Sequence, residues 1–379
     1  MDYDFNEREA MIRDLTRKIA KEKVLPVRAE LDEKSEFPYE AMAAMAQADL
    51  FRVFIPEEYE GIGGGCMEIC IVAEELSRVC AGVATTYSAN ALAAQPIVIA
   101  GNEEQKRKYL SRIASGKSFA AFALTEPGAG SDAGAIQTTA KETETGFVLN
   151  GTKQFITNGE VAEIYTVLAS TDPSRGARGL SAFIVEKGTP GFSFGKEENK
   201  MGIRASKTTE LIFQDCEIPK ENLLGRKGAG FLTAMKTFDH TRPGVGAQAV
   251  GIAQGALDEA IHYAKEREQF GKPITTFQGI QFMIADMATQ IEAARALVYS
   301  TARMIDRGVK NTARESAMAK MFASDMAMRV TTDAVQVVGG YGYMRDYPME
   351  KFMRDAKITQ IYEGTNQIQR LVVANAVLK

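Results

Sequence analysis

A carboxylate interrupts two apolar helical stretches near the end of the chain. The segment KITQIYEGTNQIQRLVV (357–373) places Glu363 between Tyr362 and Gly364, and both flanks carry apolar residues at helical spacing. Glycine breaks such a pattern, so we expect a turn between two helices here. A solvated turn is one interpretation. The other is a general base, because a carboxylate held where a helix stops can take a proton from a substrate.

The composition leaves carboxylates as the main candidates for acid–base chemistry in this chain. Only two histidines occur in 379 residues, which argues against metal sites built on His clusters and against a Ser-His-Asp triad. The four cysteines lack the partner pairs typical of zinc sites, and we expect reduced structural thiols: Cys66, Cys70, Cys80 and Cys216. We therefore expect no metal centre.

Charge and hydropathy exclude further classes. A net charge of −4 gives no general attraction to nucleic acid or to an anionic membrane. The first residues, MDYDFNEREAMIRDL, lack the basic and apolar regions of a signal peptide. No apolar run reaches the length of a membrane span. We therefore expect a cytoplasmic protein with no nucleic-acid partner and no membrane span.

A run of small residues follows a strand-like segment in ALTEPGAGSDAGA (123–135). Small residues let backbone amides approach a ligand closely, and consecutive amides form a concavity that binds anions. Thr125 and Ser131 add hydroxyl groups. A plain glycine-rich turn between strands is the alternative.

An aromatic ring and a hydroxyl share one face of the strand expected in KQFITNG (153–159). Phe155 and Thr157 lie two residues apart, which is the period of a strand. An aromatic face beside a hydrogen-bonding hydroxyl suits a planar heterocycle. A core phenylalanine in a barrel is the alternative.

The stretch QVVGGYGYMRDYPMEKFMRDAKI (336–358) ends one helix at its glycines and begins another. The second helix carries Glu350 and Arg354 at i,i+4 spacing. Such a pair is usually a surface contact that contributes little energy.

The chain divides into three parts by texture. Residues 1–118 show helical spacing punctuated by prolines, residues 119–225 show short β-rich runs between turns, and residues 226–379 show long amphipathic helices. This order predicts a mixed α and β fold: an N-terminal α-helical domain, a central antiparallel β-sandwich or barrel, and a C-terminal helix bundle.

Together these stretches resemble the acyl-CoA dehydrogenase family of flavoenzymes over essentially the whole chain. Five blocks carry the resemblance, in order: ALTEPGAGSDAGA, DHTRP (239–243), REQFGKPITTFQGIQF (267–282), QVVGGYGYMRDYPMEKFMRD and IYEGTNQIQR. The resemblance implies an N-terminal α-helical domain, a central antiparallel β-barrel domain and a C-terminal four-helix bundle. It also implies a homotetramer with one FAD per subunit, and electron-transferring flavoprotein as electron acceptor. It places the flavin ring between the β domain and the bundle, and the adenine partly against a neighbouring subunit.

The resemblance also implies the residues of the site. Those expected to contact FAD are Phe122, Leu124, Thr125, Phe155, Thr157, Arg267, Gln269, Phe270, Gln278, Gln336, Gly340, Thr365 and Gln367. Those expected to contact the acyl-CoA substrate are Ser131, Asp239, Arg242, Tyr362 and Gly364, with Asp239 and Arg242 on the CoA portion. Phe155 stands where many relatives have Trp, and it can still stack with less area.

Glu363 matches the catalytic base of most family members. The implied reaction takes the α-proton of a thioester to Glu363 while a hydride leaves Cβ for flavin N5. The thioester oxygen is then stabilised by the flavin ribityl hydroxyl and the backbone N–H of the base. Some relatives take the base from an earlier helix, but HTRPGVGAQAVGIAQG (240–255) contains no Asp or Glu, which favours Glu363.

Substrate size and reaction class stay open. The helix expected at 84–97 lines the acyl pocket in this family, and it carries small residues with Tyr87 as a residue that could shorten the cavity. Glutaryl-type relatives carry an arginine near the start of this helix that pairs with the distal carboxylate of the substrate. Residues 83–86 include no arginine here, so the resemblance disfavours a dicarboxylic acyl group. Short-chain, butyryl-type members are most similar, while cyclic and branched acyl groups remain alternatives. A flavin oxidase or monooxygenase of the same fold, or a noncatalytic protein, is the competing interpretation.

Overall fold

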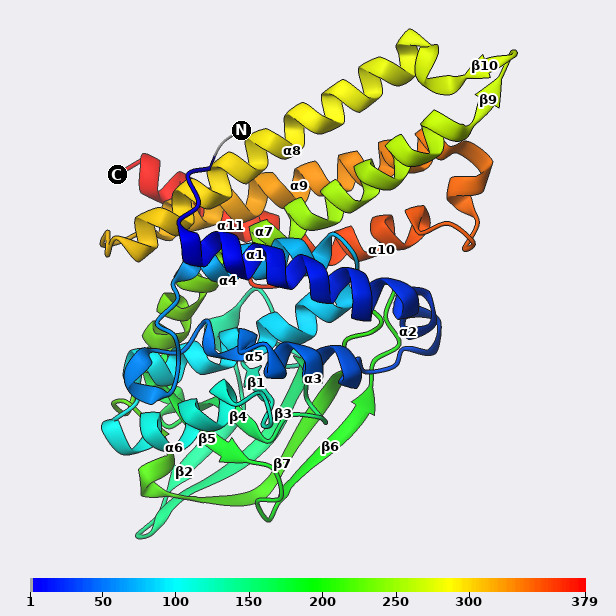
Figure 1. The fold of residues 1–379 in the computed structure, drawn as a ribbon. Coiled ribbons are helices and arrows are strands. Elements are labelled where there is room, and N and C mark those ends of the chain that lie inside the picture. Colours follow the sequence, from blue (N-terminus) through cyan, green and yellow to red (C-terminus); the bar gives the residue numbers. More distant parts are fainter. Residues whose placement is uncertain (1–2) are drawn as a thin grey trace.

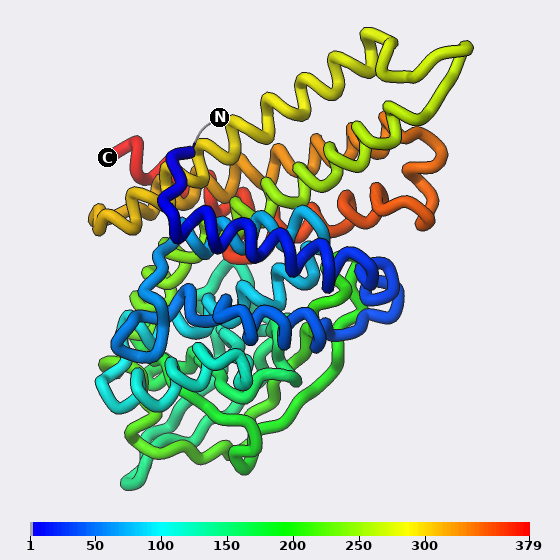
Figure 2. Tube along the Cα trace, viewed as in Figure 1, coloured from blue at the N-terminus to red at the C-terminus, as the bar shows by residue number. Residues whose placement is uncertain are grey.

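The long C-terminal helices and the sheet occupy opposite ends of the molecule, and N-terminal helices lie between them and beside the sheet (Figure 1). The computed structural model describes residues 3–379. Its chain path runs from the N-terminal helices through the sheet to a bundle of long helices (Figure 2). No helix among residues 3–379 combines the length and the apolar character needed to cross a membrane.

The N-terminal part is helical, as expected. Its helices are α1 (Glu7–Ile19), α2 (Arg28–Lys34), α3 (Tyr39–Gln47), α4 (Cys66–Ser77), α5 (Ala81–Ala100) and α6 (Glu103–Ala114). Asn6 and Asn102 begin α1 and α6 with capping boxes, each pairing with the side chain three residues later. Nearly all of α4 and most of α5 are buried, which makes these two helices the centre of the molecule.

The central part is one eight-stranded sheet in the order β6-β7-β3-β2-β4-β5-β8, with β1 also paired to β4. The strands are β1 (Ala120–Ala123), β2 (Thr139–Glu142), β3 (Gly146–Thr157), β4 (Ile164–Ser170), β5 (Leu180–Glu186), β6 (Phe192–Glu197), β7 (Thr208–Pro219) and β8 (Leu223–Leu224). The expected β domain is confirmed, but the pairings of β4 with β1 and with β2 are parallel. Strand direction could not be predicted, because alternation of apolar residues is the same for both orientations.

The C-terminal part is the expected helix bundle. Its elements are α7 (Gly230–Glu266), α8 (Gln278–Asp306), α9 (Ala313–Val338), α10 (Met349–Thr359) and α11 (Asn366–Val377). The strands β9 (Glu268–Gln269) and β10 (Lys272–Pro273) form a short ribbon that projects where α7 turns into α8 (Figure 1). The three-part fold class predicted from the sequence is confirmed.

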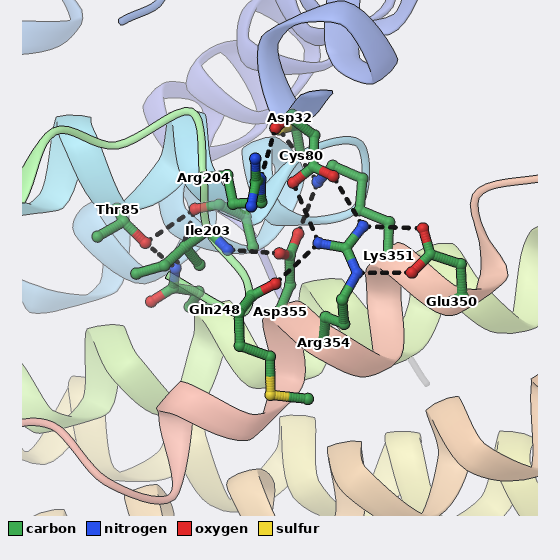
Figure 3. A network of polar contacts seen from close by, with 12 residues as sticks. Asp32, Cys80, Thr85, Ile203, Arg204, Gln248, Glu350, Lys351, Arg354 and Asp355 are labelled. Atoms are coloured by element: carbon green, nitrogen blue, oxygen red, sulfur yellow. Dashed lines mark hydrogen bonds and ion pairs between the residues drawn. The ribbon is translucent and has the colours of Figure 1, made fainter. Parts of the chain in front are cut away.

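A buried polar network fixes α10 against both other parts of the chain (Figure 3). Oδ1 of Asp355 accepts the backbone N–H of Ile203 at 2.6 Å, and Oδ2 accepts Nζ of Lys351 at 2.6 Å. Arg354 binds Asp32 of α2 at 2.7 Å as well as Glu350. The Glu350–Arg354 pair expected at the surface is therefore part of an interdomain network, because Arg354 reaches a second carboxylate from a distant helix.

Candidate active site

A cavity of about 480 Å³ lies where the sheet, α5, α7 and the loop after α10 meet. Seven of the site residues predicted from the sequence line it: Phe122, Leu124, Thr125, Phe155, Thr157, Tyr362 and Glu363. Phe122 of β1 and Glu363, which are 241 positions apart in the sequence, therefore share one space.

The loop between α10 and α11 presents Glu363 to this cavity. Glu363 and Gly364 both adopt left-handed backbone conformations, with φ of 51° and 95°. A left-handed glutamate is uncommon and is typical of a site held in place by its surroundings. Glycine is favoured next, because L side chains rarely adopt a φ of 95° and a Cβ on Gly364 would also displace Nε2 of Gln369, which would lie 2.6 Å away.

Side chains from three helices hold the backbone of this turn. Nε of Arg242 in α7 donates to the carbonyl oxygen of Glu363 at 3.2 Å. Nζ of Lys320 in α9 donates to the carbonyl oxygen of Gly364 at 2.8 Å. Nε2 of Gln369 in α11 donates to both carbonyls, at 3.2 and 2.9 Å. The turn is thus hydrogen-bonded from several sides.

The Glu363 carboxylate is half-buried and oriented by Thr241. The Thr241 hydroxyl donates to Oε2 of Glu363 at 2.6 Å. Burial raises the pKa of Glu363 above its ordinary value, although the Thr241 hydrogen bond and the positive charges of Arg242 and Lys320 oppose that shift. A raised pKa brings a carboxyl group closer to neutral pH, which is where a general base is most effective.

Tyr362 takes part in a polar chain beside the base. Its hydroxyl donates to Oε1 of Gln248, and Nε2 of Gln248 donates to the Thr85 hydroxyl at 2.7 Å. Burial raises the pKa of Tyr362, with the nearby Glu363 charge adding to the effect. Tyr362 is therefore a fixed hydrogen-bond donor and not an acid–base group at neutral pH.

The sheet side of the cavity fits the planar cofactor expected from the sequence. Phe155 lies at an irregularity of β3, with φ of 59°, and its side chain is 56% exposed while lining the cavity. The hydroxyls of Thr125 and Thr157 line the same space and have no hydrogen-bond partner within residues 3–379. An exposed aromatic ring with two free hydroxyls suits a heterocycle with polar edges.

A buried ion pair supports this side of the cavity. Nζ of Lys153 lies 2.7 Å from Oε1 of Glu126 and also donates to the carbonyl oxygen of Leu124 at 3.1 Å. Glu126 accepts the backbone N–H groups of Gln137 and Thr138 at 2.6 and 2.9 Å. The pair therefore fixes both ends of the small-residue loop predicted to approach a ligand.

Six residues predicted to contact FAD lie away from the cavity. They are exposed near the end of the bundle where β9 and β10 project (Figure 1): Arg267, Gln269, Phe270, Gln278, Gln336 and Gly340. Phe270 is 92% exposed. A single chain does not bring these residues to the flavin side of the site, and their assignment stays a prediction.

The other predicted contacts occupy mixed positions. Ser131 and Gln367 are exposed, and Thr365 accepts the N–H of Ile368 as the cap of α11. Asp239 is half-buried and lies 3.4 Å from Arg242, which is only 5% exposed. Arg242 thus binds the loop between α10 and α11 that carries Glu363, while its contact with CoA stays a prediction.

One expectation for the acyl pocket is wrong. Tyr87 does not line the cavity: it is fully buried, and its hydroxyl donates to the carbonyl oxygen of Leu50 at 2.8 Å. Tyr87 lies one helical turn from Ala91, which does line the cavity, but its ring packs against Phe51 and Phe54 at centroid distances of 5.5 and 5.7 Å. Helical spacing alone could not show which of these neighbouring positions faces the cavity.

Sequence reasoning named no role for four residues that the structure gathers around the base: Thr241, Gln248, Lys320 and Gln369. One signal was available. Lys320 is a single charged residue on the buried stripe of α9 that includes Ser316 and Ala323. A lone lysine on such a stripe is unexpected unless it has buried partners.

Most of the chain matches three domain models of one family. Residues 6–117 match the acyl-CoA dehydrogenase N-terminal domain, residues 121–216 match the middle domain, and residues 228–378 match the C-terminal domain.

Individual proteins agree with this match. Acryloyl-CoA reductase (NADH) of Anaerotignum propionicum is 50% identical over 381 residues, covering 100% of this chain and 96% of the relative. The structure of butyryl-CoA dehydrogenase from Megasphaera elsdenii aligns with a TM-score of 0.97 at 47% identity, over 100% of both chains. A chain in the structure of the electron transferring flavoprotein of Acidaminococcus fermentans aligns with a TM-score of 0.98 at 53% identity, again over 100% of both chains.

Proposed function

The chain belongs to the acyl-CoA dehydrogenase family, and from this we propose that it converts a short-chain acyl-CoA thioester to the trans-2-enoyl-CoA. Members of this family are oxidoreductases that act on CH–CH groups. The observation that carries the proposal is the position of Glu363. Its carboxylate lines the cavity, has a raised pKa and lies on a turn held by three helices.

FAD is the cofactor of this reaction, and the sheet side of the cavity fits it. Phe155 would lie against the flavin ring, and Thr125 and Thr157 would donate to its polar edge. When bound, FAD supplies the acceptor for the hydride that leaves Cβ. The exposed residues at the end of the bundle, including Arg267 and Gln336, would hold the adenine side of a FAD in a neighbouring subunit of the proposed homotetramer.

The chain's own residues perform the proton chemistry. Glu363 takes the proton from Cα onto its carboxylate, and Thr241 keeps that carboxylate aimed into the cavity. The backbone N–H of Glu363 has no acceptor among residues 3–379, so it is free to donate to the thioester oxygen. That donor would stabilise negative charge on the oxygen as the α-proton leaves.

The residues that line the cavity support an acyl group of modest size. Ala89, Ala91, Leu92 and Val98 of α5 line the cavity together with Phe54, and no charged side chain of α5 does so. This favours an uncharged acyl chain over a dicarboxylic one. The similarity to butyryl-CoA dehydrogenase of Megasphaera elsdenii supports a chain of that class. Branched and cyclic acyl groups are the alternatives, and the titration described below includes an ester of each kind.

Reduction of a 2-enoyl-CoA is a second candidate, favoured by the 50% identity to acryloyl-CoA reductase of Anaerotignum propionicum. The same residues serve both directions, with Glu363 returning the proton to Cα. In either direction we propose electron-transferring flavoprotein as the electron partner, which the similarity to the Acidaminococcus fermentans structure supports. A cytoplasmic location stays a prediction from the sequence.

Anaerobic titration of the flavin absorbance tests the proposal. The purified enzyme is mixed with butyryl-, octanoyl-, isobutyryl-, glutaryl- and cyclohexanecarboxyl-CoA, and bleaching near the flavin maximum is followed. Rapid bleaching by butyryl-CoA supports dehydrogenation of short chains. In the reverse test, the reduced flavin should recover its absorbance with crotonyl-CoA, and recovery without forward bleaching would select the reductase. Bleaching by no ester, with fast reoxidation by O2, would favour an oxidase or monooxygenase.

A further inference from the structure

We propose that Lys320 is a positioning residue for the base: it binds the carbonyl of Gly364 and so holds the left-handed turn that aims Glu363 into the cavity. This inference rests on the proposed role of Glu363. Lys320 itself does not line the cavity and would touch neither substrate nor flavin.

The surroundings of Lys320 are unusual for a lysine. Its residue is 0% exposed, and its Nζ donates to the carbonyl oxygen of Gly364 and to Oδ1 of Asn366, both at 2.8 Å. No carboxylate pairs with it directly among residues 3–379. A buried ammonium held only by neutral acceptors is unfavourable for folding, so this arrangement calls for a reason other than stability.

The two acceptors of Lys320 lie where the loop that carries Glu363, between α10 and α11, meets α11. Gly364 follows Glu363, and Asn366 is the first residue of α11. Asn366 is fixed in turn by α9, since its Nδ2 donates to Asp325 at 2.7 Å and to Ser324 at 2.9 Å. Lys320 therefore connects one rigid helix to the two residues that end the loop.

The turn needs such support. Its two successive left-handed residues direct the carbonyls of Glu363 and Gly364 away from any helical partner, so side-chain donors must satisfy them. Arg242 binds only the first carbonyl, and Gln369 bridges both. Lys320 is the remaining donor to the second carbonyl, and a rotation of that peptide would redirect the adjacent glutamate.

Lys320 also acts on the charge of the base. Its ammonium and the Arg242 guanidinium both favour the ionised form of Glu363. The other ionisable groups of the bundle that lie near the turn or the cavity include Asp239 and His240 of α7, Asp306 of α8, Asp325 of α9 and Arg370 of α11; α5 and the strands present only neutral groups to the cavity among the described residues. Burial lowers the pKa of Lys320 to about 7, with Glu363 and Asp325 opposing and Arg242 assisting.

These two contributions can be separated experimentally. A neutral amine keeps two N–H donors, so the hydrogen bonds to Gly364 and Asn366 can persist without the charge. Lys320→Met removes both donor and charge, whereas Lys320→Gln keeps an N–H donor alone. Arg329→Met is the matched control, because Arg329 lies on the same helix with an exposed side chain.

The test combines three measurements on the flavin-containing enzyme. We expect Lys320→Met to slow flavin reduction by butyryl-CoA by roughly 10- to 100-fold through misplacement of the base, with KM changed by less than about threefold. Backbone amides of 360–366 should exchange with solvent at least about tenfold faster, while amides of the sheet are unchanged. In Lys320→Met, infrared difference spectra recorded against Glu363→Gln should show that Glu363 titrates at a higher pH than in the wild type.

Lys320→Gln should restore most of the amide protection but leave the Glu363 titration raised, and Arg329→Met should resemble the wild type in all three measurements. The proposal is overturned if folded Lys320→Met reduces flavin and protects 360–366 as the wild type does, or if exchange rises equally throughout α9 and the sheet. If Lys320→Met does not fold, Lys320→Gln decides by its protection and titration. A wild type that no acyl-CoA bleaches would refute the proposed function alone, since amide exchange still reports on the loop.

Discussion

The hydroxyl of Thr241 lies 2.6 Å from Oε2 of Glu363 and bridges 122 residues of sequence. Thr241 belongs to a long buried helix of the bundle, and Glu363 belongs to a short loop after α10. Their hydrogen bond aims the carboxylate and stabilises its charge, while burial acts in the opposite direction. The basicity of Glu363 is therefore a balance that single substitutions can shift.

Removal of the carboxylate should abolish most proton transfer. We expect Glu363→Gln to slow flavin reduction by at least roughly 10²- to 10⁴-fold, the usual contribution of a positioned base. FAD content and binding of a CoA ester should be retained, because glutamine preserves the shape of the side chain. Stopped-flow absorbance gives the rate, and perturbation of the flavin spectrum gives ester binding. Unchanged reduction would remove Glu363 from the mechanism.

Loss of the Thr241 hydroxyl should shift the pH profile. The hydrogen bond favours the charged carboxylate, so Thr241→Val should raise the pKa of Glu363 further. A base works only when ionised, and the rising limb of the rate should therefore move to higher pH, with activity lost first on the acidic side. Thr241→Ser keeps the hydroxyl and should retain the wild-type profile. A shift to lower pH in the valine variant would contradict this account.

The ion pair between Lys153 and Glu126, on the sheet side of the cavity, should contribute strongly to the free energy of unfolding. Glu126→Gln leaves the buried Lys153 ammonium without its carboxylate, and removal of one partner of such a pair costs about 3–5 kcal/mol. We expect urea unfolding to show a loss of that size, together with lower FAD content, since Lys153 also binds the carbonyl of Leu124. Glu144→Gln, at an exposed turn between β2 and β3, is the control. Equal stability of the two variants would refute the prediction.

Two substitutions in the network of Figure 3 should differ in their effect on the free energy of unfolding. Asp355→Asn removes the counter-charge of buried Lys351, and we expect a loss of about 3–5 kcal/mol in the free energy of unfolding. Glu350→Gln should cost less than about 1 kcal/mol, because Arg354 keeps Asp32 as a partner and Glu350 is partly exposed. Thermal unfolding of both variants gives the comparison. The reverse order would show that Asp355 is not central to the interdomain contact.

The end of the bundle should matter for cofactor retention and not for proton transfer. Arg267 is exposed beside Tyr341, with its guanidinium 5.7 Å from the ring. We expect Arg267→Ala to lose FAD on gel filtration, and its residual holoenzyme to reduce flavin at the wild-type rate. Lys265→Ala, two residues earlier on α7 and also exposed, should keep its FAD. Full occupancy in the Arg267 variant would refute this assignment to FAD.

Much of the architecture can be predicted from the spacing of apolar residues along the chain. Periodicity separated the helical, β and helical parts, since the spacing of apolar residues differs between strands and helices. It also singles out Glu363 before Gly364, and in the structure the φ of 95° at residue 364 favours glycine. Phe155 and Thr157 were recognised as sharing one strand face, and both line the cavity.

How these parts meet depends on contacts between segments that are distant in the sequence. The parallel pairing of β1 with β4, the burial of Tyr87 behind the pocket and the reach of Arg354 to Asp32 depend on which distant segments become neighbours. The same is true of Thr241 and Lys320, whose polar groups contact Glu363 and Gly364 across 122 and 44 residues. Local periodicity reports which face of an element is buried, but it does not report what the buried face touches. The protonation of the base depends on those contacts, because burial and charge act over a few ångströms in space.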